Sequence, residues 1–132
     1  MNGSIDFDRL LEQAQTAAAR AYAPYSGYHV GAALLCADGS VFTGSNVENA
    51  SYSLSVCAER NALFQAVHAG HKEFLAIAIY VDDDELFPPC GACRQVLAEF
   101  NPEIPVLYAN QTQSVLTDLA ILLPQAFSLT EP

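Results

Sequence analysis

The chain has 132 residues, of which 52% are hydrophobic and 15% charged, so we expect one folded domain spanning residues 1–132 and no disordered segment. Fifteen acidic residues against five lysines and arginines give a formal net charge of -10, which argues against a nucleic-acid partner. The apolar runs are far shorter than the roughly 20 residues that cross a bilayer, and the N-terminus resembles neither a secretory signal nor a transit peptide. We therefore expect a cytoplasmic protein with no membrane segment.

The N-terminal third predicts a helix followed by a hairpin. Apolar residues recur at helical spacing from Asp6 to Tyr22, and Pro24 closes that segment. Two apolar runs, His29–Cys36 and Val41–Val47, then meet across Asp38-Gly39. Asp-Gly between apolar runs is a hairpin signal, so these runs are predicted to be antiparallel strands.

The middle of the chain predicts a helix and a buried strand. A helix is expected over Cys57–Ala69, because its apolar positions have helical spacing and Gly70 supplies a C-terminal stop. The run Phe74–Val81 is apolar without alternation, which is typical of a strand covered on both faces. We therefore place this strand centrally and interpret the acidic run Asp82–Glu85 that follows as a solvated loop.

The last third predicts a third helix and a further strand. Pro88-Pro89 introduces a helix over about Cys90–Phe100, and Pro105–Asn110 is a strand candidate. A turn is expected at Gln111–Gln113, while Leu116–Leu123 is ambiguous between a strand and a short helix. Strands alternating with helices predict an α/β sandwich, with helices packed on a central sheet.

Three of the four cysteines have a spacing that suggests a metal site. Cys90 and Cys93 form a CxxC pair, which alone is weak evidence, but Cys57 also lies at a predicted helix N-terminus, as this pair does. Helix N-termini lower the pKa of a thiol and favour the thiolate that binds metal. Three protein ligands leave one position of a tetrahedral zinc ion open, which is the catalytic arrangement and not the structural one.

The remaining cysteine and the histidines are expected to have no such role. Cys36 ends a predicted strand without a paired partner in sequence, so we interpret it as a buried thiol. The three histidines are His29, His68 and His71, of which the last two have helical spacing, but cations near a helix C-terminus are ordinary and the cysteines already complete a site. We therefore expect surface histidines that bind no metal.

Glu59 and Arg60 follow Cys57 directly and place two charges in an apolar segment. A glutamate in the first turn of a helix is favourable by the helix dipole alone, and a helical arginine is usually solvated. Beside three candidate zinc ligands, however, Glu59 suits proton transfer. Arg60, three residues after Cys57, can hydrogen-bond the cysteine sulfur and temper the charge of the thiolates.

These residues belong to a wider pattern that carries a family resemblance. Cys-Ala-Glu followed by Pro-Cys-x-x-Cys is the cysteine-ligated form of the zinc deaminase signature. Five segments resemble the small homotetrameric cytidine deaminases: PYSGYHVGAAL (24–34), NVENASY (46–52), CAERNA (57–62), PCGACRQVLAEF (89–100) and LLPQAF (122–127). The similarity covers nearly the whole chain.

The resemblance implies a fold and a reaction. The fold would be a three-layer α/β/α sandwich with a mixed central sheet of about five strands. One zinc ion per subunit would be held by Cys57, Cys90 and Cys93, and it would supply the hydroxide that attacks C4 of cytosine. Glu59 would carry protons to N3 and to the departing amino group, and the backbone around Ala58 would contact the pyrimidine.

The resemblance also implies how the nucleoside is held. Asn46 and Glu48 match the pair that holds the ribose 3′-hydroxyl, and residues i and i+2 of an extended segment do face the same way. Tyr28 matches a ring beside the base, whereas Tyr52 and Phe127 match rings that a neighbouring subunit supplies. A homotetramer with shared active sites is therefore expected.

Two positions depart from the expected pattern. Tyr28 stands where phenylalanine is usual, which adds a hydroxyl that needs a partner, and Asn61 stands where threonine is common. We expect zinc-dependent hydrolysis of cytidine and 2′-deoxycytidine to uridine and 2′-deoxyuridine plus ammonia, in pyrimidine salvage. The alternatives are deamination of another aminopyrimidine nucleoside of the blasticidin type, and a structural zinc module without catalysis.

Overall fold

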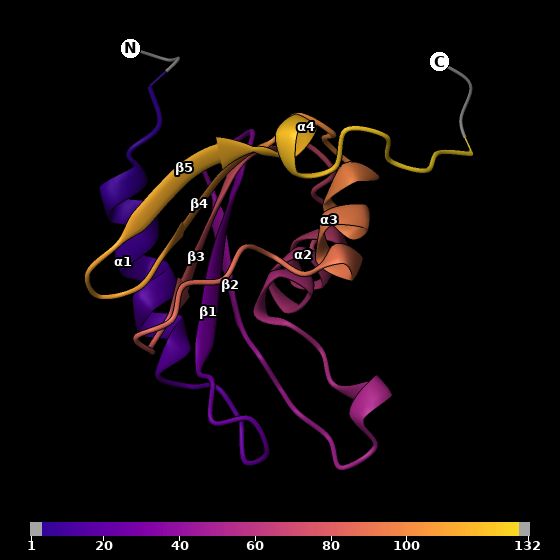
Figure 1. The fold of residues 1–132 in the computed structure, drawn as a ribbon. Helices are drawn as coiled ribbons and strands as arrows, with labels where there is room; N and C mark the ends of the chain where they lie inside the picture. Colours follow the sequence, from indigo (N-terminus) through magenta and orange to yellow (C-terminus); the bar gives the residue numbers. More distant parts are fainter. Residues whose placement is uncertain (1–3, 130–132) are drawn as a thin grey trace.

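The computed structural model describes residues 4–129, in which strands and helices alternate along the chain (Figure 1). The strands are β1 (Val30–Cys36), β2 (Val41–Ser45), β3 (Phe74–Val81), β4 (Pro105–Ala109) and β5 (Ser114–Asp118). The helices are α1 (Phe7–Ala18), α2 (Ala58–His68), α3 (Gly91–Ala98) and α4 (Leu119–Leu122), with a short 3-10 turn at Tyr52–Leu54.

The strands form one mixed sheet in the order β2-β1-β3-β4-β5. All neighbouring pairs are antiparallel except β3 and β4, which are parallel and are joined through α3. The central position predicted for β3 is confirmed, and all but one of its residues are buried. Such a strand has both faces covered, which explains why its sequence shows no polar alternation.

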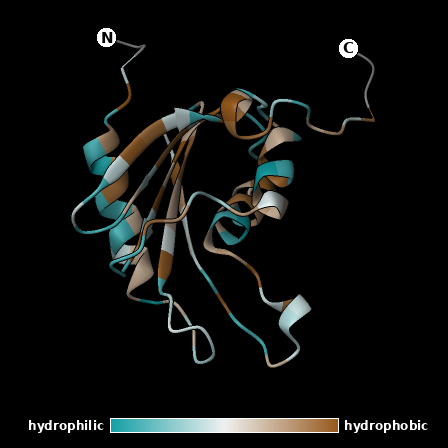
Figure 2. Cartoon of the chain, in the orientation of Figure 1, coloured by the Kyte–Doolittle hydropathy of each residue, from teal (hydrophilic) through white to brown (hydrophobic). Residues whose placement is uncertain are grey.

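Helices cover the two faces of the sheet and produce three layers (Figure 1). One hydrophobic core lies between α1 and the sheet, and a second, larger core lies between the opposite face and α2, α3 and α4. Figure 2 shows hydrophobic residues along the strands, whereas α1 carries both hydrophilic and hydrophobic residues. Its buried residues have helical spacing and form one face, as in an amphipathic helix. The predicted α/β/α sandwich is confirmed.

Glycine allows α2 to lie very close to β2. A Cβ atom added at Gly44 would lie 2.5 Å from the backbone nitrogen of Ala62 and 2.6 Å from the carbonyl oxygen of Ala58. No side chain fits in that space, so the first turns of α2 rest directly on the strand. The position of the N-terminus of α2 is therefore set by backbone contact.

The structure corrects one predicted helix end and resolves the ambiguous segment. The first helix ends at Ala18 and not at Tyr22, because the backbone of Tyr22 pairs with the chain beyond β2: its N–H donates to Asn46 O at 2.9 Å. The ambiguous segment Leu116–Leu123 contains both structures, since β5 runs to Asp118 and α4 follows. Among residues 4–129, no helix is long and apolar enough to cross a membrane.

Candidate active site

Three cysteines meet where α2 and α3 begin. Cys57 and Cys90 are the N-cap residues of these helices and have extended backbone angles, while Cys93 lies in the first turn of α3. The Cys57 and Cys90 sulfurs are 3.6 Å apart, and the Cys90 and Cys93 sulfurs 3.3 Å. The convergence of two helix N-termini expected from the sequence is thus present in the fold.

This set of donors fits one zinc ion. All three sulfurs lie within 4.8 Å of one another, and thiolates around tetrahedral zinc are about 3.8 Å apart for Zn–S bonds of about 2.3 Å. Only small side-chain shifts are needed to reach that spacing. Because the cluster offers three ligands, a fourth position remains for water or substrate.

The thiols of the cluster are electrostatically unequal. A hydrogen bond from the Cys93 thiol, together with Arg60 and Cys90, lowers the pKa of Cys57 to about 5 although burial opposes this shift. The same bond to Cys57, with burial, raises the pKa of Cys93, so this thiol keeps its proton until a metal displaces it. Of these two thiols, Cys57 therefore ionises more readily in the metal-free chain.

Arg60 supports this charge, as its spacing predicts. Its Nη2 lies 3.6 Å from Cys57 Sγ, and the thiolate raises the pKa of the guanidinium. Its Nε is buried and has no hydrogen-bond partner within residues 4–129. The guanidinium thus has a spare donor beside a cluster that gains negative charge when all three thiols ionise.

Glu59 is the buried carboxyl of the site. Its side chain lies in the second position of α2 and is only 5% exposed. Burial, and secondarily the Cys57 thiolate, raise the pKa of Glu59 from 4.5 to about 7. A carboxyl with a pKa near neutrality can both accept and donate a proton at physiological pH, which suits general acid and base catalysis.

A cavity of about 210 Å³ lies beside this cluster. Six of the residues predicted for the site line it: Tyr28, Asn46, Cys57, Ala58, Glu59 and Cys90. The rest of its wall is largely apolar: Val30, Ile79, Val81, Phe87, Pro88 and Ala109. A larger hollow of about 660 Å³ borders α1, β2 and α2, but no metal-ligating cluster of the described residues lines it.

The apolar wall was missed in the sequence because its residues come from separate strands and a loop. The ring of Phe87 packs edge-on against Tyr28, with ring centroids 4.9 Å apart. The only sequence signal for Phe87 at this site is its position immediately before Pro88-Pro89 and the CxxC pair.

Asn46 and Glu48 diverge in this structure. The Asn46 amide lines the cavity and is fixed on both sides, since Oδ1 accepts from Val30 N at 2.8 Å and Nδ2 donates to Tyr28 O at 2.8 Å. The Glu48 carboxylate instead accepts from the backbone nitrogens of Tyr25 and Ser26, at 2.9 and 3.1 Å, and from the Ser26 hydroxyl. Glu48 is not part of the cavity wall.

Tyr52 and Phe127 lie away from the cavity. Their residues are 75% and 67% exposed, and neither lines the cavity of its own chain. Tyr52 lies in the 3-10 turn before α2, and Phe127 in the segment after α4, where its backbone exchanges hydrogen bonds with the side chain of Gln95.

The two departures from the expected pattern have partners in the fold. The Tyr28 hydroxyl donates to Glu85 Oε1 at 2.8 Å, so the acidic loop predicted to be simply solvated also contacts the cavity wall. The side chain of Asn61 donates to Ser45 O at 2.7 Å and ties α2 to the end of β2. Neither contact touches a cysteine of the cluster.

Comparison with known proteins identifies one family. The family model described as the cytidine and deoxycytidylate deaminase zinc-binding region matches residues 5–109. A cytidine deaminase of Halalkalibacterium halodurans is 47% identical over 94% of this chain and 96% of its own length, and one of Sporosarcina psychrophila is 46% identical over 94% and 93%.

The crystal structure of a cytidine deaminase from Burkholderia pseudomallei superimposes with a TM-score of 0.88 and 49% identity. The match covers 93% of this chain and all of the crystallised one, so it includes both the sheet and the helices that carry the cysteines.

Proposed function

The chain belongs to the cytidine and deoxycytidylate deaminase family, and we infer that it is a zinc-dependent cytidine deaminase that hydrolyses cytidine to uridine and ammonia. The main support for this inference is that three thiols and one buried carboxyl, that of Glu59, lie together beside a cavity with an apolar wall. We propose that residues 1–132 form a single catalytic domain and that 2′-deoxycytidine is accepted as well.

The cluster of Cys57, Cys90 and Cys93 would hold the zinc ion. When bound there, zinc supplies Lewis acidity and activates water for attack on C4 of the base. Arg60 donates to the Cys57 sulfur and offsets part of the thiolate charge, which keeps the metal electrophilic.

Glu59 would perform the proton transfers. It lines the cavity next to the cluster, and burial keeps its pKa near neutrality, so it can take one proton from water and deliver it to N3. It can then carry the second proton of the same water to the leaving amino group. The backbone of Ala58, which also lines the cavity, would contact the pyrimidine and hold the base against the apolar wall.

Asn46 and Glu48 would bind the ribose. Asn46 is fixed at the cavity by two hydrogen bonds to the 28–30 segment. A carboxylate can accept about four hydrogen bonds, and Glu48 receives three from Tyr25 and Ser26, leaving one acceptor position on Oε2 for the 3′-hydroxyl. Like charge would disfavour a phosphate there, so nucleosides are preferred to nucleotides.

A homotetramer with shared active sites would complete the pocket. One chain provides a cavity smaller than the roughly 300 Å³ at which ligand sites usually begin. Tyr52 and Phe127 are exposed rings outside their own cavity, which is the placement needed for residues that close the pocket of another subunit. A cytoplasmic location and a role in pyrimidine salvage also remain predictions.

The alternative of a non-catalytic zinc module makes opposite predictions for Glu59. The test is zinc content per chain, together with the ultraviolet loss of cytidine, for the wild type and Glu59→Gln. Retained zinc with abolished turnover in the variant supports catalysis by Glu59. The enzyme assignment would be refuted if the zinc-loaded wild type turned over none of cytidine, 2′-deoxycytidine and blasticidin S. Turnover of blasticidin S alone would favour deamination of a blasticidin-type nucleoside.

A further inference from the structure

A second group of metal-ligating side chains lies at the far end of β1. The Cys36 sulfur, an Asp38 carboxylate oxygen and a His71 ring nitrogen lie within 4.8 Å of one another. Val30, at the start of β1, lines the catalytic cavity, and Cys36 comes six residues later. At about 3.3 Å per residue, Cys36 lies about 20 Å along the strand from this wall residue, and the two groups share no side chain, so they are separate sites.

Local structure brings Cys36 to this group. Cys36 follows the regular alternation of β1, so its side chain faces the same side of the sheet as those of Ala32 and Leu34. The Cys36 side chain joins the core on the α2 side of the sheet, the side from which His71 approaches after the end of α2. Cys36 and His71, 35 residues apart in sequence, thereby become neighbours.

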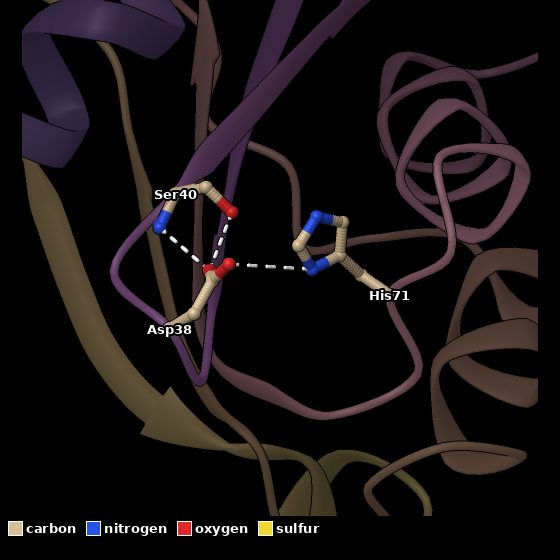
Figure 3. Close-up of polar contacts among 3 residues, drawn as sticks. All are labelled: Asp38, Ser40 and His71. Carbon is tan, nitrogen blue, oxygen red and sulfur yellow. Dashed lines mark hydrogen bonds and ion pairs between the residues drawn. The ribbon is translucent and has the colours of Figure 1, made fainter.

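The hairpin turn orients Asp38 (Figure 3). Its Oδ1 accepts from the backbone nitrogen of Ser40 at 2.9 Å and from the Ser40 hydroxyl at 2.6 Å. The other oxygen, Oδ2, faces the Nδ1 atom of His71 at 3.8 Å. The ring of His71 packs on Phe42, with centroids 5.2 Å apart, which helps to fix its orientation.

Asp38 and His71 lie at ion-pair distance without a hydrogen bond, and this spacing can also accommodate a shared cation. At 3.8 Å the Asp38 and His71 atoms are too far apart for a hydrogen bond. Around a tetrahedral zinc-like ion, an oxygen and a nitrogen ligand are about 3.3 Å apart, and either lies about 3.5 Å from a thiolate sulfur. We propose that Cys36, Asp38 and His71 form a second, peripheral site for a divalent transition-metal ion, with water completing its coordination.

The donor types select the class of ion. Thiolate and imidazole favour zinc, cobalt and similar borderline-soft ions, whereas calcium and magnesium require oxygen ligands. Burial raises the pKa of the Cys36 thiol, so an ion must bind sulfur strongly enough to displace the proton. Spacing in the sequence does not indicate this site, because Cys36 has no paired cysteine and lies 35 residues before His71.

A bound ion would connect two segments that lie far apart in the chain. Cys36 and Asp38 belong to the β1–β2 hairpin, and His71 to the connection between α2 and β3. One backbone hydrogen bond, from Ala37 N to Glu73 O at 2.9 Å, already joins these segments. The ion would stabilise the folded state without contacting the substrate cavity.

The test is a titration of the zinc-loaded protein with Co²⁺. The starting protein carries one zinc per chain in the catalytic cluster, and elemental analysis after titration follows both metals. We expect one added cobalt per chain without loss of zinc, tetrahedral cobalt absorption, and a thiolate-to-cobalt charge-transfer band. We also expect the thermal unfolding temperature to rise when the second site is filled.

Variants assign the site. His71→Ala and Asp38→Ala should each weaken cobalt binding by roughly tenfold or more, while leaving cytidine turnover unchanged. His68→Ala is the matched control, because it removes an exposed histidine from the end of α2 outside the cluster, and it should bind cobalt like the wild type. Cys36→Ser should lose the charge-transfer band.

Three results would overturn the proposal. In the first, the wild type takes up no cobalt beyond what exchanges with the catalytic zinc. In the second, the wild type and His71→Ala take up cobalt equally. In the third, His71→Ala and His68→Ala lose cobalt binding to the same extent. If Cys36→Ser does not fold, the comparison among Asp38→Ala, His71→Ala and His68→Ala decides the question. These three substitutions change side chains in the hairpin turn, at the end of α2 and in the connection that follows α2, and none of the three residues is buried.

Discussion

Replacing Glu59 with glutamine measures what burial of this carboxylate costs the fold. Burial and the Cys57 thiolate raise the pKa of Glu59 from 4.5 to about 7 in the folded chain. Between these values the folded state binds more protons than the unfolded state, so the free energy of unfolding falls as the pH rises through this window. Glutamine carries no charge at any pH and removes this dependence.

The size of the effect follows from the shift in pKa. Each pKa unit corresponds to 1.36 kcal/mol, so raising the pKa from 4.5 to about 7 costs the ionised state about 3 kcal/mol. Most of this penalty develops between pH 5 and pH 8. The metal-free Glu59→Gln protein should therefore gain about 2–3 kcal/mol relative to the metal-free wild type over that range.

Urea unfolding of both proteins at several pH values tests this expectation. The samples need a chelator, a reductant and one fixed protein concentration, because metal and subunit association would both add stability. Glu12→Gln, which changes an exposed glutamate of α1, should follow the wild type. Parallel pH profiles for the wild type and Glu59→Gln would refute the argument that Glu59 is ionised at a cost.

Three further substitutions test the support of the site. Gly44→Ala should lower the free energy of unfolding by about 2–3 kcal/mol, because the added Cβ would lie 2.5 Å from the α2 backbone. Gly91→Ala is the control: its added Cβ meets no atom, so the free energy of unfolding should change by less than about 0.5 kcal/mol. Equal effects of the two substitutions would contradict close packing of α2 on β2. Arg60→Ala should weaken zinc binding by about 10–100-fold in competition with a chelator, and unchanged affinity would exclude its role at Cys57. Asn61→Ala should cost about 1 kcal/mol in urea unfolding with turnover unchanged, and a large loss of turnover would show that this bond shapes the site.

Several features of the site could be predicted because they depend on local sequence. Cys57 and Cys90 precede apolar helical patterns, so their places at helix N-termini follow from short-range rules, and Glu59 and Arg60 take their positions from the same helix. Phe74–Val81 was recognised as a central strand from its uninterrupted apolar character. Each of these predictions needed information from fewer than about fifteen neighbouring residues.

Other features depend on contacts between distant segments. Helix α1 ends early because Tyr22 pairs with Asn46, and Glu48 turns to the Tyr25–Ser26 backbone although it follows Asn46 by two residues. The partners of Tyr28 and the apolar wall of the cavity likewise come from other parts of the chain. Spacing along the sequence carries no information about such pairs.

The amino-acid order determined most of the helices and strands, the buried strand and the set of three cysteines, because periodicity and capping act within single helices and strands. Only the packed fold decided that Glu59 has a pKa near neutrality, since that value comes from complete burial beside Cys57. The packed fold alone also brought Cys36 to His71, through the return of the chain after α2. Desolvation and long-range contact arise when surfaces meet, and neither is encoded in any short stretch of sequence.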